Sequence, residues 1–156
     1  MSATRRPFGF TNRVVNPILA PLLRTPVGRR MGRRLAVVRY RGRRTGTAYQ
    51  LVTQYAREGA TVWIMPGNPQ QKTWWRNLRQ PMTIELWLAG QPVTGEARAI
   101  EGARDPAAVR EGLALYLGQF PRVRKQLKLA APSGGADPAL DQLSMTAVLV
   151  RVDLRR

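Results

Sequence analysis

The sequence contains no cysteine and no histidine. Without cysteine there is no disulfide framework, no thiolate nucleophile and no zinc ribbon. Without histidine, the commonest general base and metal ligand is also missing. These two absences exclude Ser-His-Asp and Cys-His catalysis and any metal centre built on histidine.

Long apolar runs are missing too. No run approaches the length of about 20 residues that a membrane-spanning helix needs. No apolar core with a small-residue cleavage site follows Arg5 and Arg6, as a secretory signal would require. We therefore expect a cytoplasmic protein, with peripheral contact with the inner face of the membrane left open. The length of 156 residues predicts a single domain over 12–156, preceded by a loose basic arm over 1–11.

Acidic residues are absent from the first 57 positions, since the first of the chain is Glu58. Thirteen arginines lie in that stretch, and the formal net charge of the chain is +17. Such asymmetry favours an anionic partner, which would be a phosphorylated cofactor, an acidic lipid surface or nucleic acid. The alternative is a codon bias toward arginine, which outnumbers lysine 23 to 3. No helix-turn-helix, zinc finger or aromatic RNA-binding strand is recognisable, so we expect no specific nucleic-acid partner.

The pattern of apolar residues and turn signals predicts mainly antiparallel strands with few helices. An apolar segment over 12–23, interrupted by Pro17 and Pro21, is expected either to pack over the sheet or to lie on an anionic bilayer. A helix begins at Asp105-Pro106 and reaches Leu117, with a second piece ending near Leu129. The expected strands are 35–40, 48–57, 61–65, 83–88, 93–100 and 146–152, with a short helix over 71–79 and a surface loop over 132–141. This order indicates an α+β barrel-like fold rather than a doubly wound sheet.

The stretch 39–78 carries the candidate site. Arg43 and Arg44, in the turn GRRTG at 42–46, offer forked donors for anionic oxygens. Trp74 and Trp75 offer a stacking face, and adjacent helical residues point about 100° apart, so only one of them faces a ligand; we expect Trp74. Lys72 could pair with a charged ligand. Together these residues predict a site for a flat aromatic molecule that carries phosphate.

The ordered series GRRTG (42–46), a strand, Glu58-Gly59, VWIMPGNP (62–69) and WWRNL (74–78) resembles the deazaflavin-dependent nitroreductase family. The resemblance covers roughly 12–152 and implies a split β-barrel of about six mainly antiparallel strands with two or three flanking helices. It also implies coenzyme F-420, an 8-hydroxy-5-deazaflavin, in a groove beside the barrel, with FMN or FAD as the less expected choice. Hydride would pass from the cofactor to a stacked acceptor, with no catalytic side chain and no metal, because the cofactor carries the chemistry.

Carried over position by position, the resemblance gives a cofactor site. The basic turn would hold the phosphate and polyglutamate end, the strand from Tyr49 to Gln54 would line the ring, and the next loop would wrap it. The cofactor-binding residues implied are Arg43, Arg44, Thr45, Tyr49, Gln50, Leu51, Met65, Pro66, Gly67, Asn68, Lys72, Trp74, Trp75 and Asn77.

The sequence departs from the family pattern at several of these positions. Tyr49 stands where a basic residue is common, Val52 stands where a proline is familiar, and Lys72-Thr73 replaces another proline. Tyrosines that line the acceptor pocket in the best-known member align near Phe120, Val123 and Gln126. We therefore expect an apolar acceptor, such as a quinone or a lipid, bound by Tyr116, Phe120 and Val123.

Three alternatives stay open. Tyr116 and Phe120 share one helical face, so both could be core residues. The protein could bind a flavin, deazaflavin or lipid without catalysis. Its oligomeric state could be monomer or homodimer.

Overall fold

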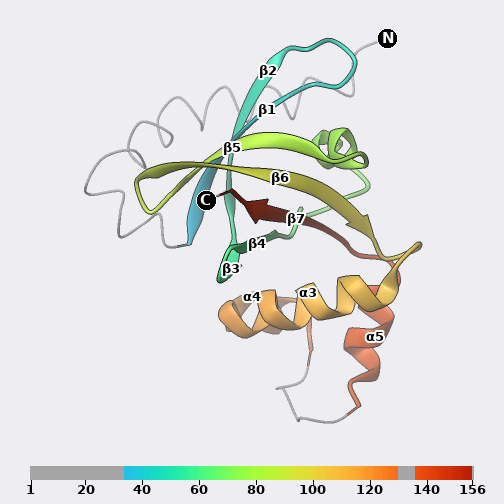
Figure 1. Cartoon of the computed structure of the whole chain (residues 1–156). Helices are drawn as coiled ribbons and strands as arrows, with labels where there is room; N and C mark the ends of the chain where they lie inside the picture. The colour runs from blue at the N-terminus through green and yellow to red at the C-terminus, as the bar shows by residue number, and fades with distance from the viewer. Residues whose placement is uncertain (1–33, 130–135, 156) are drawn as a thin grey trace.

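The computed structural model describes residues 34–129 and 136–155, which form one antiparallel sheet with helices packed against it (Figure 1). The expected basic arm over 1–11 and apolar segment over 12–23 lie outside the described residues. The sheet contains β1 (Leu35–Arg41), β2 (Ala48–Gln54), β3 (Ala56–Glu58), β4 (Thr61–Ile64), β5 (Met82–Leu88), β6 (Gln91–Glu101) and β7 (Val148–Leu154), in the spatial order β2-β1-β5-β6-β7-β4-β3.

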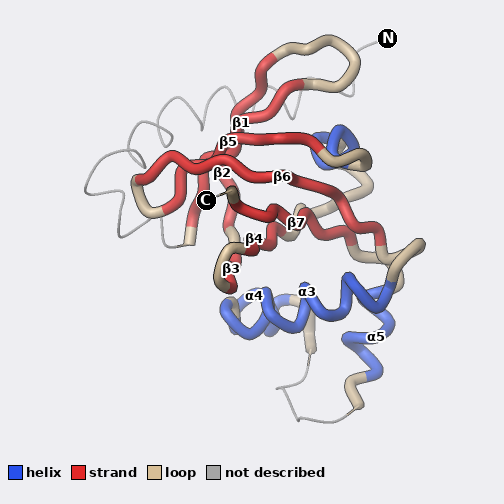
Figure 2. The backbone as a smooth tube through the Cα atoms, in the orientation of Figure 1, coloured by secondary structure: helices blue, strands red, loops and turns tan. Residues whose placement is uncertain are grey.

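This strand order shows that the sheet is curled. β2 and β3 lie at opposite ends of the order, yet only Tyr55 separates them in the chain. A flat sheet of this width could not bring its two edges to consecutive residues, so the sheet wraps round until they meet. The curl is visible in Figure 2. The predicted strand over 48–57 is therefore two strands, because the chain leaves β1 at Gln54 and joins β4 from Ala56.

Tight turns connect neighbouring strands as the sequence predicts. Glu58-Gly59 joins β3 to β4, with Glu58 paired to Thr61. Ala89 and Gly90 join β5 to β6 with φ values of 50° and 78°. Two successive residues at positive φ are typical of the type I′ turn, whose twist matches that of the flanking strands.

Alternate residues of β4 divide between two hydrophobic cores, as the two-residue period of a strand requires. Val62 and Ile64 of β4 face the inside of the curl, where they join Val150 and Val152 of β7. The intervening Trp63 joins the second core, between the outer face of the sheet and the helices.

Among the described residues, α3 (Pro106–Gln119) packs on that outer face, and α4 (Pro121–Gln126) and α5 (Pro138–Ser144) pack against α3. Gly112 lets α3 approach the sheet, because a Cβ there would lie 2.6 Å from both Leu149 and Trp63. Val109, Leu113 and Leu117 project from α3 into the same core and are almost fully buried. A single 3-10 turn, η2 (Trp74–Leu78), replaces the predicted helix over 71–79.

The expectation of a surface loop over 132–141 is wrong from Pro138 onward, where α5 begins. Asp137 caps α5 by accepting the backbone N–H of Leu140 at 3.1 Å. Asp105 caps α3 in the same way, accepting from Ala108 at 3.1 Å. An aspartate followed by proline thus begins both helices, and the glycine-rich residues before Asp137 concealed the second signal.

The other expected strands and the helices after Asp105 agree with the structure to within a few residues. The strands expected over 35–40, 61–65, 83–88, 93–100 and 146–152 all form. The α+β barrel-like class is confirmed. Among the described residues, no helix is both long and apolar enough to cross a membrane.

Candidate functional site

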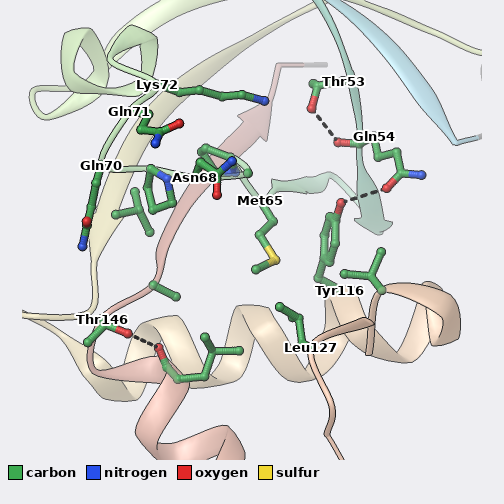
Figure 3. A pocket seen from close by; sticks show the side chains of 17 residues that line it. Thr53, Gln54, Met65, Asn68, Gln70, Gln71, Lys72, Tyr116, Leu127 and Thr146 are labelled. Atoms are coloured by element: carbon green, nitrogen blue, oxygen red, sulfur yellow. Dashed lines mark hydrogen bonds between the residues drawn. The ribbon is translucent and has the colours of Figure 1, made fainter. Parts of the chain in front are cut away.

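A pocket of about 620 Å³ lies between the loop that follows β4 and the helices that cover the sheet (Figure 3). We call the segment 65–72 the loop wall. The opposite side, which we call the helix wall, is contributed by α3, α4, α5 and the start of β7. Thr53 and Gln54, at the end of β2, complete the lining. The helix-wall residues are Tyr116, Val123, Leu127, Leu143, Thr146, Ala147 and Val148.

The loop wall is built by a turn centred on Asn68. This residue has φ 49°, a left-handed conformation that asparagine tolerates better than most side chains. Its carbonyl oxygen accepts the backbone N–H groups of Gln71 and Lys72, each at 2.9 Å. The indole nitrogen of Trp75 donates to the carbonyl of Pro69 at 2.8 Å. The loop wall is therefore fastened to η2 by a side chain that is itself buried.

The helix wall is mainly apolar, with one phenol. Tyr116 is buried, and its hydroxyl donates to Gln54 Oε1 at 3.5 Å, the outer limit of a hydrogen bond (Figure 3). Burial raises the pKa of Tyr116 to about 12, so the phenol stays protonated at neutral pH. Leu127 keeps 38% of its surface exposed while lining the pocket. The helix wall thus offers an apolar surface that reaches solvent at Leu127.

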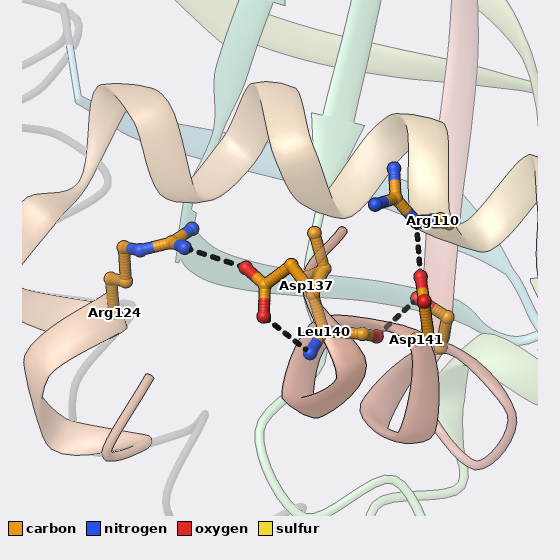
Figure 4. Close-up of polar contacts among 6 residues, drawn as sticks. Arg110, Arg124, Asp137, Leu140 and Asp141 are labelled. Carbon is orange, nitrogen blue, oxygen red and sulfur yellow. Dashed lines mark hydrogen bonds and ion pairs between the residues drawn. The ribbon is translucent and has the colours of Figure 1, made fainter. Parts of the chain in front are cut away.

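Two ion pairs fasten the helices of this wall to one another (Figure 4). Arg124 of α4 donates to Asp137 at 2.9 Å, and both side chains are largely buried. The same carboxylate caps α5 through its other oxygen. Arg110 of α3 pairs with Asp141 of α5 at the surface. Asp137 therefore joins the helix that carries Val123 to the helix that carries Leu143.

The charge of the pocket lining is one-sided. Lys72 is its cation, and no carboxylate occurs among the lining residues, all of which lie in the described part of the chain. In Figure 3 the Lys72 side chain extends from the loop wall toward the side on which Thr53 lies. An anionic group entering the pocket would meet a positive charge and no competing negative one.

Seven of the residues proposed for the site line this pocket, although the sequence places them in three separate segments. Five come from the loop wall and two from the helix wall: Met65, Pro66, Gly67, Asn68, Lys72, Tyr116 and Val123. The other ten do not line it: Arg43, Arg44, Thr45, Tyr49, Gln50, Leu51, Trp74, Trp75, Asn77 and Phe120. Whether any of the seventeen contacts a cofactor or an acceptor stays a prediction.

Trp74 and Trp75 are both core residues, each with 4% of its surface exposed. Trp74 packs near Tyr40, which in turn stacks on Tyr49 with ring centroids 5.5 Å apart. Phe120 is also buried and packs on Tyr116 at a centroid distance of 4.8 Å. The sequence left open whether Tyr116 and Phe120 are core residues. Phe120 is one and does not line the pocket, whereas Tyr116 is buried and also lines it.

Arg43 is occupied by hydrogen bonds to Asn77 near the end of η2 and to Gln80 just after it. Its backbone N–H donates to Asn77 Oδ1 at 2.9 Å and its Nε to the Asn77 carbonyl at 3.0 Å. The two terminal nitrogens donate to Gln80, one to Oε1 at 3.2 Å and one to the carbonyl at 2.7 Å. Three of the five guanidinium N–H groups are thereby used within the protein. Arg44 is exposed, and among the described residues none forms a hydrogen bond or ion pair with its side chain.

Ten lining residues are absent from the list of predicted site residues. Thr53 and Gln54 belong to the strand that the resemblance assigned to the cofactor ring, but at its far end. Pro69, Gln70 and Gln71 lie inside the predicted loop and could have been added by continuity. Leu127, Leu143, Thr146, Ala147 and Val148 carry no local signal, because they reach the pocket only through the packing of α4, α5 and β7.

The arrangement suits the binding and orientation of a flat, partly apolar molecule. The volume falls within the range typical of small-molecule sites. The lining has an apolar face, several amides and one cation, and its phenol does not ionise near neutral pH. A deazaflavin or flavin ring with an anionic tail fits this set of residues. The pocket offers no side chain suited to general-base chemistry at neutral pH.

Comparisons with known proteins bear on the fold. No protein-family model matches the sequence, and no curated protein matches it. A solved structure of an F-420-H2-dependent reductase superposes with a TM-score of 0.52 at 14% identity, covering 77% of this chain and 94% of that one. A protein from Listeria innocua described as a candidate pyridoxamine 5′-phosphate oxidase matches at 12% identity and TM-score 0.48, covering 90% and 93%. An FAD-binding protein from Mesorhizobium loti matches at 16% identity and TM-score 0.43, covering 79% and 82%. The first of these likenesses shows that the chain has the split-barrel fold that its sequence resemblance predicts.

Proposed function

We propose that the protein is an oxidoreductase that binds the deazaflavin coenzyme F-420 in the pocket between the loop wall and the helix wall. The observation that carries the proposal is the pocket itself, which gathers seven predicted site residues in a fold shared with an F-420-H2-dependent reductase. An FAD-binding protein among the similar structures keeps a flavin as the alternative cofactor.

The residues of the pocket take the following roles in this proposal. Reduced F-420, when bound, supplies a hydride. Met65 and the backbone around Gly67 and Asn68 would hold the ring, while Lys72 would attract the anionic part of the ligand. Arg44 and Thr45, in the turn at 42–46, lie outside the pocket lining and would meet the phosphate end of the ligand. The binding residues orient the ring and exclude water, and the proposal assigns no side chain to proton transfer.

A hydrophobic acceptor, such as a quinone, is proposed to enter along the helix wall. Val123 and Leu127 present apolar surface there, and Leu127 is partly open to solvent. The Tyr116 hydroxyl can donate to a carbonyl oxygen of the acceptor, because its bond to Gln54 is long and therefore weak. A conjugated ketone would then be preferred to a purely aliphatic molecule.

The cofactor is tested by purifying the protein from a host that makes deazaflavin and recording its absorbance spectrum. We expect a visible deazaflavin band that co-purifies with the protein at near-stoichiometric amount. A flavin spectrum would replace F-420 by FMN or FAD, and a colourless protein that also fails to bind added cofactor would contradict the proposal.

Turnover is tested separately, by following oxidation of reduced F-420 with a panel of quinones and nitroaromatic compounds. Quinones are expected to be reduced faster than nitroimidazoles. Cofactor binding without turnover of any acceptor would favour a non-catalytic binding protein. The observation that keeps this second function in view is that Phe120, Val123 and Gln126 stand near the positions where the best-known member of the resembling family has acceptor-pocket tyrosines.

A further inference from the structure

We propose that Arg43 is a positioning residue that holds the loop wall through η2, and that Arg44 is the arginine of the turn that meets an anion. The resemblance to a cofactor-binding turn treats the two arginines alike, but the structure separates them by what their side chains contact. The ligand-binding test of this inference rests on the proposed function, and its hydrogen-exchange test does not.

The first step is the geometry of the Arg43 fork. Its guanidinium donates to the carbonyl of Asn77 and to both the carbonyl and the side-chain oxygen of Gln80, at 2.7–3.2 Å. A planar fork can meet these acceptors together, whereas the single ammonium of a lysine cannot reach them in the same plane. The contacts join residues 34–37 positions apart in the chain. Arg43 therefore ties the turn between β1 and β2 to the end of η2.

The second step leads from η2 to the pocket. The Asn77 amide nitrogen donates to the Trp74 carbonyl at 2.9 Å, while Asn77 Oδ1 accepts the Arg43 backbone N–H. Trp75, in the same turn, donates its indole N–H to the Pro69 carbonyl in the loop wall. A continuous connection thus runs from Arg43 through Asn77 and Trp75 to a pocket-lining residue.

Arg44 shows the contrast within one turn. Arg41 donates to the Gly46 carbonyl at 3.0 Å, and the Thr45 hydroxyl donates to the Thr47 hydroxyl at 2.9 Å. These bonds fix the backbone of the turn without involving the Arg44 side chain. Arg44 is exposed and makes no side-chain hydrogen bond to any described residue. No described residue occupies its fork, and the inference assigns that fork to a phosphate or carboxylate from outside.

The two roles are separated by comparing two ligands. The first is F-420, and the second is its 8-hydroxy-5-deazaflavin ring compound without the phosphate and glutamate end. Arg43→Ala should lower the affinity for both ligands by a similar factor of about tenfold to a hundredfold, because it disturbs the loop wall that meets the ring. Arg44→Ala is the matched control and should lower the affinity for F-420 but not for the ring compound. This loss of affinity should become smaller as the salt concentration rises.

The conservative variant sharpens this comparison. Arg43→Lys keeps the charge and loses the fork, so it should behave like Arg43→Ala toward the ring compound. If Arg43→Lys restores F-420 binding, or if Arg43→Ala spares the ring compound, Arg43 is an anion ligand and the inference is wrong. If the unaltered protein binds neither ligand, the proposed function fails, and the next measurement still decides the inference.

That measurement is amide hydrogen exchange without ligand, read at Gln71 and Lys72, together with the indole N–H resonance of Trp75. In Arg43→Ala both amides should exchange about tenfold faster or more, and the indole resonance should shift. Arg44→Ala should leave all three signals unchanged. Unchanged exchange in a folded Arg43→Ala protein would overturn the inference.

A milder variant covers the case in which Arg43→Ala does not fold. Gln80→Ala removes the side-chain acceptor of one Arg43 hydrogen bond and leaves the other three and the net charge intact. It should raise exchange at the same two amides by a smaller factor. A Gln80→Ala protein with no change at Gln71, Lys72 or the Trp75 indole would contradict the proposed connection.

Discussion

The two walls of the pocket are held by different kinds of interaction. The loop wall, 65–72, has no regular secondary structure and is fixed by a few hydrogen bonds, chiefly through Asn68 and the Trp75 indole. The helix wall rests on a hydrophobic core in which Leu113 and Leu117 are almost fully buried against the sheet. One wall is therefore fixed by directional contacts at a few points and the other by continuous packing.

This difference predicts different responses to substitution. Packing in a shared core contributes to the stability of the whole domain, so its loss lowers the global free energy of unfolding. Hydrogen bonds that fix an exposed loop can open locally while the sheet stays folded. Substitutions in the helix wall should change stability first, and substitutions that loosen the loop wall should change ligand affinity first.

The largest effect is expected for Leu113→Ala in α3. The side chain is completely buried, so its truncation should lower the free energy of unfolding by about 2–5 kcal/mol. Urea denaturation measures this loss. Met145→Ala is the matched control, because Met145 is 60% exposed and its truncation should cost less than about 0.5 kcal/mol. Equal losses for the two variants would show that α3 does not anchor the helix wall.

Asp137→Ala should have the next largest effect. It removes both the cap of α5 and the partner that Arg124 has at 2.9 Å, which together should cost about 2–3 kcal/mol. Asp137→Asn keeps an oxygen for the cap and should cost less. Asp141→Asn removes the exposed pair with Arg110 and should have the smallest effect of the three, because solvent screens that pair. Urea denaturation ranks the three variants by their loss of unfolding free energy. A larger loss for Asp141→Asn than for Asp137→Ala would contradict the claim that the buried Asp137 contacts hold the helix wall together.

Trp75→Phe tests the loop wall from the side of η2. The variant loses the hydrogen bond to Pro69, worth about 0.5–1.5 kcal/mol, and keeps most of the buried ring. We expect a small change in unfolding free energy and a clear loss of affinity for F-420, both measured on the same preparation. If stability falls as far as in Leu113→Ala while affinity is retained, the proposed separation of the two walls is wrong.

The smallest effect concerns pH. Burial raises the pKa of Tyr116 from 10.0 to about 12, so the folded state keeps a proton that the unfolded state loses as pH rises. The corresponding stability is fully present below about pH 10 and is lost as pH rises toward 12. The free energy of unfolding of the unaltered protein minus that of Tyr116→Phe should therefore stay constant from about pH 6 to 9. Above about pH 10 this difference should fall. A step near neutral pH would contradict this assignment.

The sequence predicted the loop wall better than the helix wall, and the reason is physical. The loop wall is one continuous segment whose glycine, asparagine and proline mark a turn wherever the chain goes next. Leu127, Leu143 and Val148 become neighbours only when α4, α5 and β7 pack together, and an apolar residue carries no sign of which cavity it will face.

The helices show the same limit in another form. Asp105-Pro106 predicted the start of α3 correctly, but the identical Asp137-Pro138 was outweighed by the glycines before it. Arg43 shows that residue type alone does not settle a role. A forked donor in a turn can meet a ligand phosphate or a distant carbonyl, and its acceptors at Asn77 and Gln80 become visible only in the folded chain.

The central claim is that F-420 binds between the two walls, and calorimetric titration of a pocket-blocking variant tests it most directly. Val123→Trp places a large side chain in the pocket, whereas Arg122→Trp places the same side chain on an exposed, non-lining position of α4. We predict micromolar F-420 binding by the unaltered protein and by Arg122→Trp, and at least about tenfold weaker binding by Val123→Trp. Absence of binding by the unaltered protein at tens of micromolar, or equal affinity in all three proteins, would contradict the account.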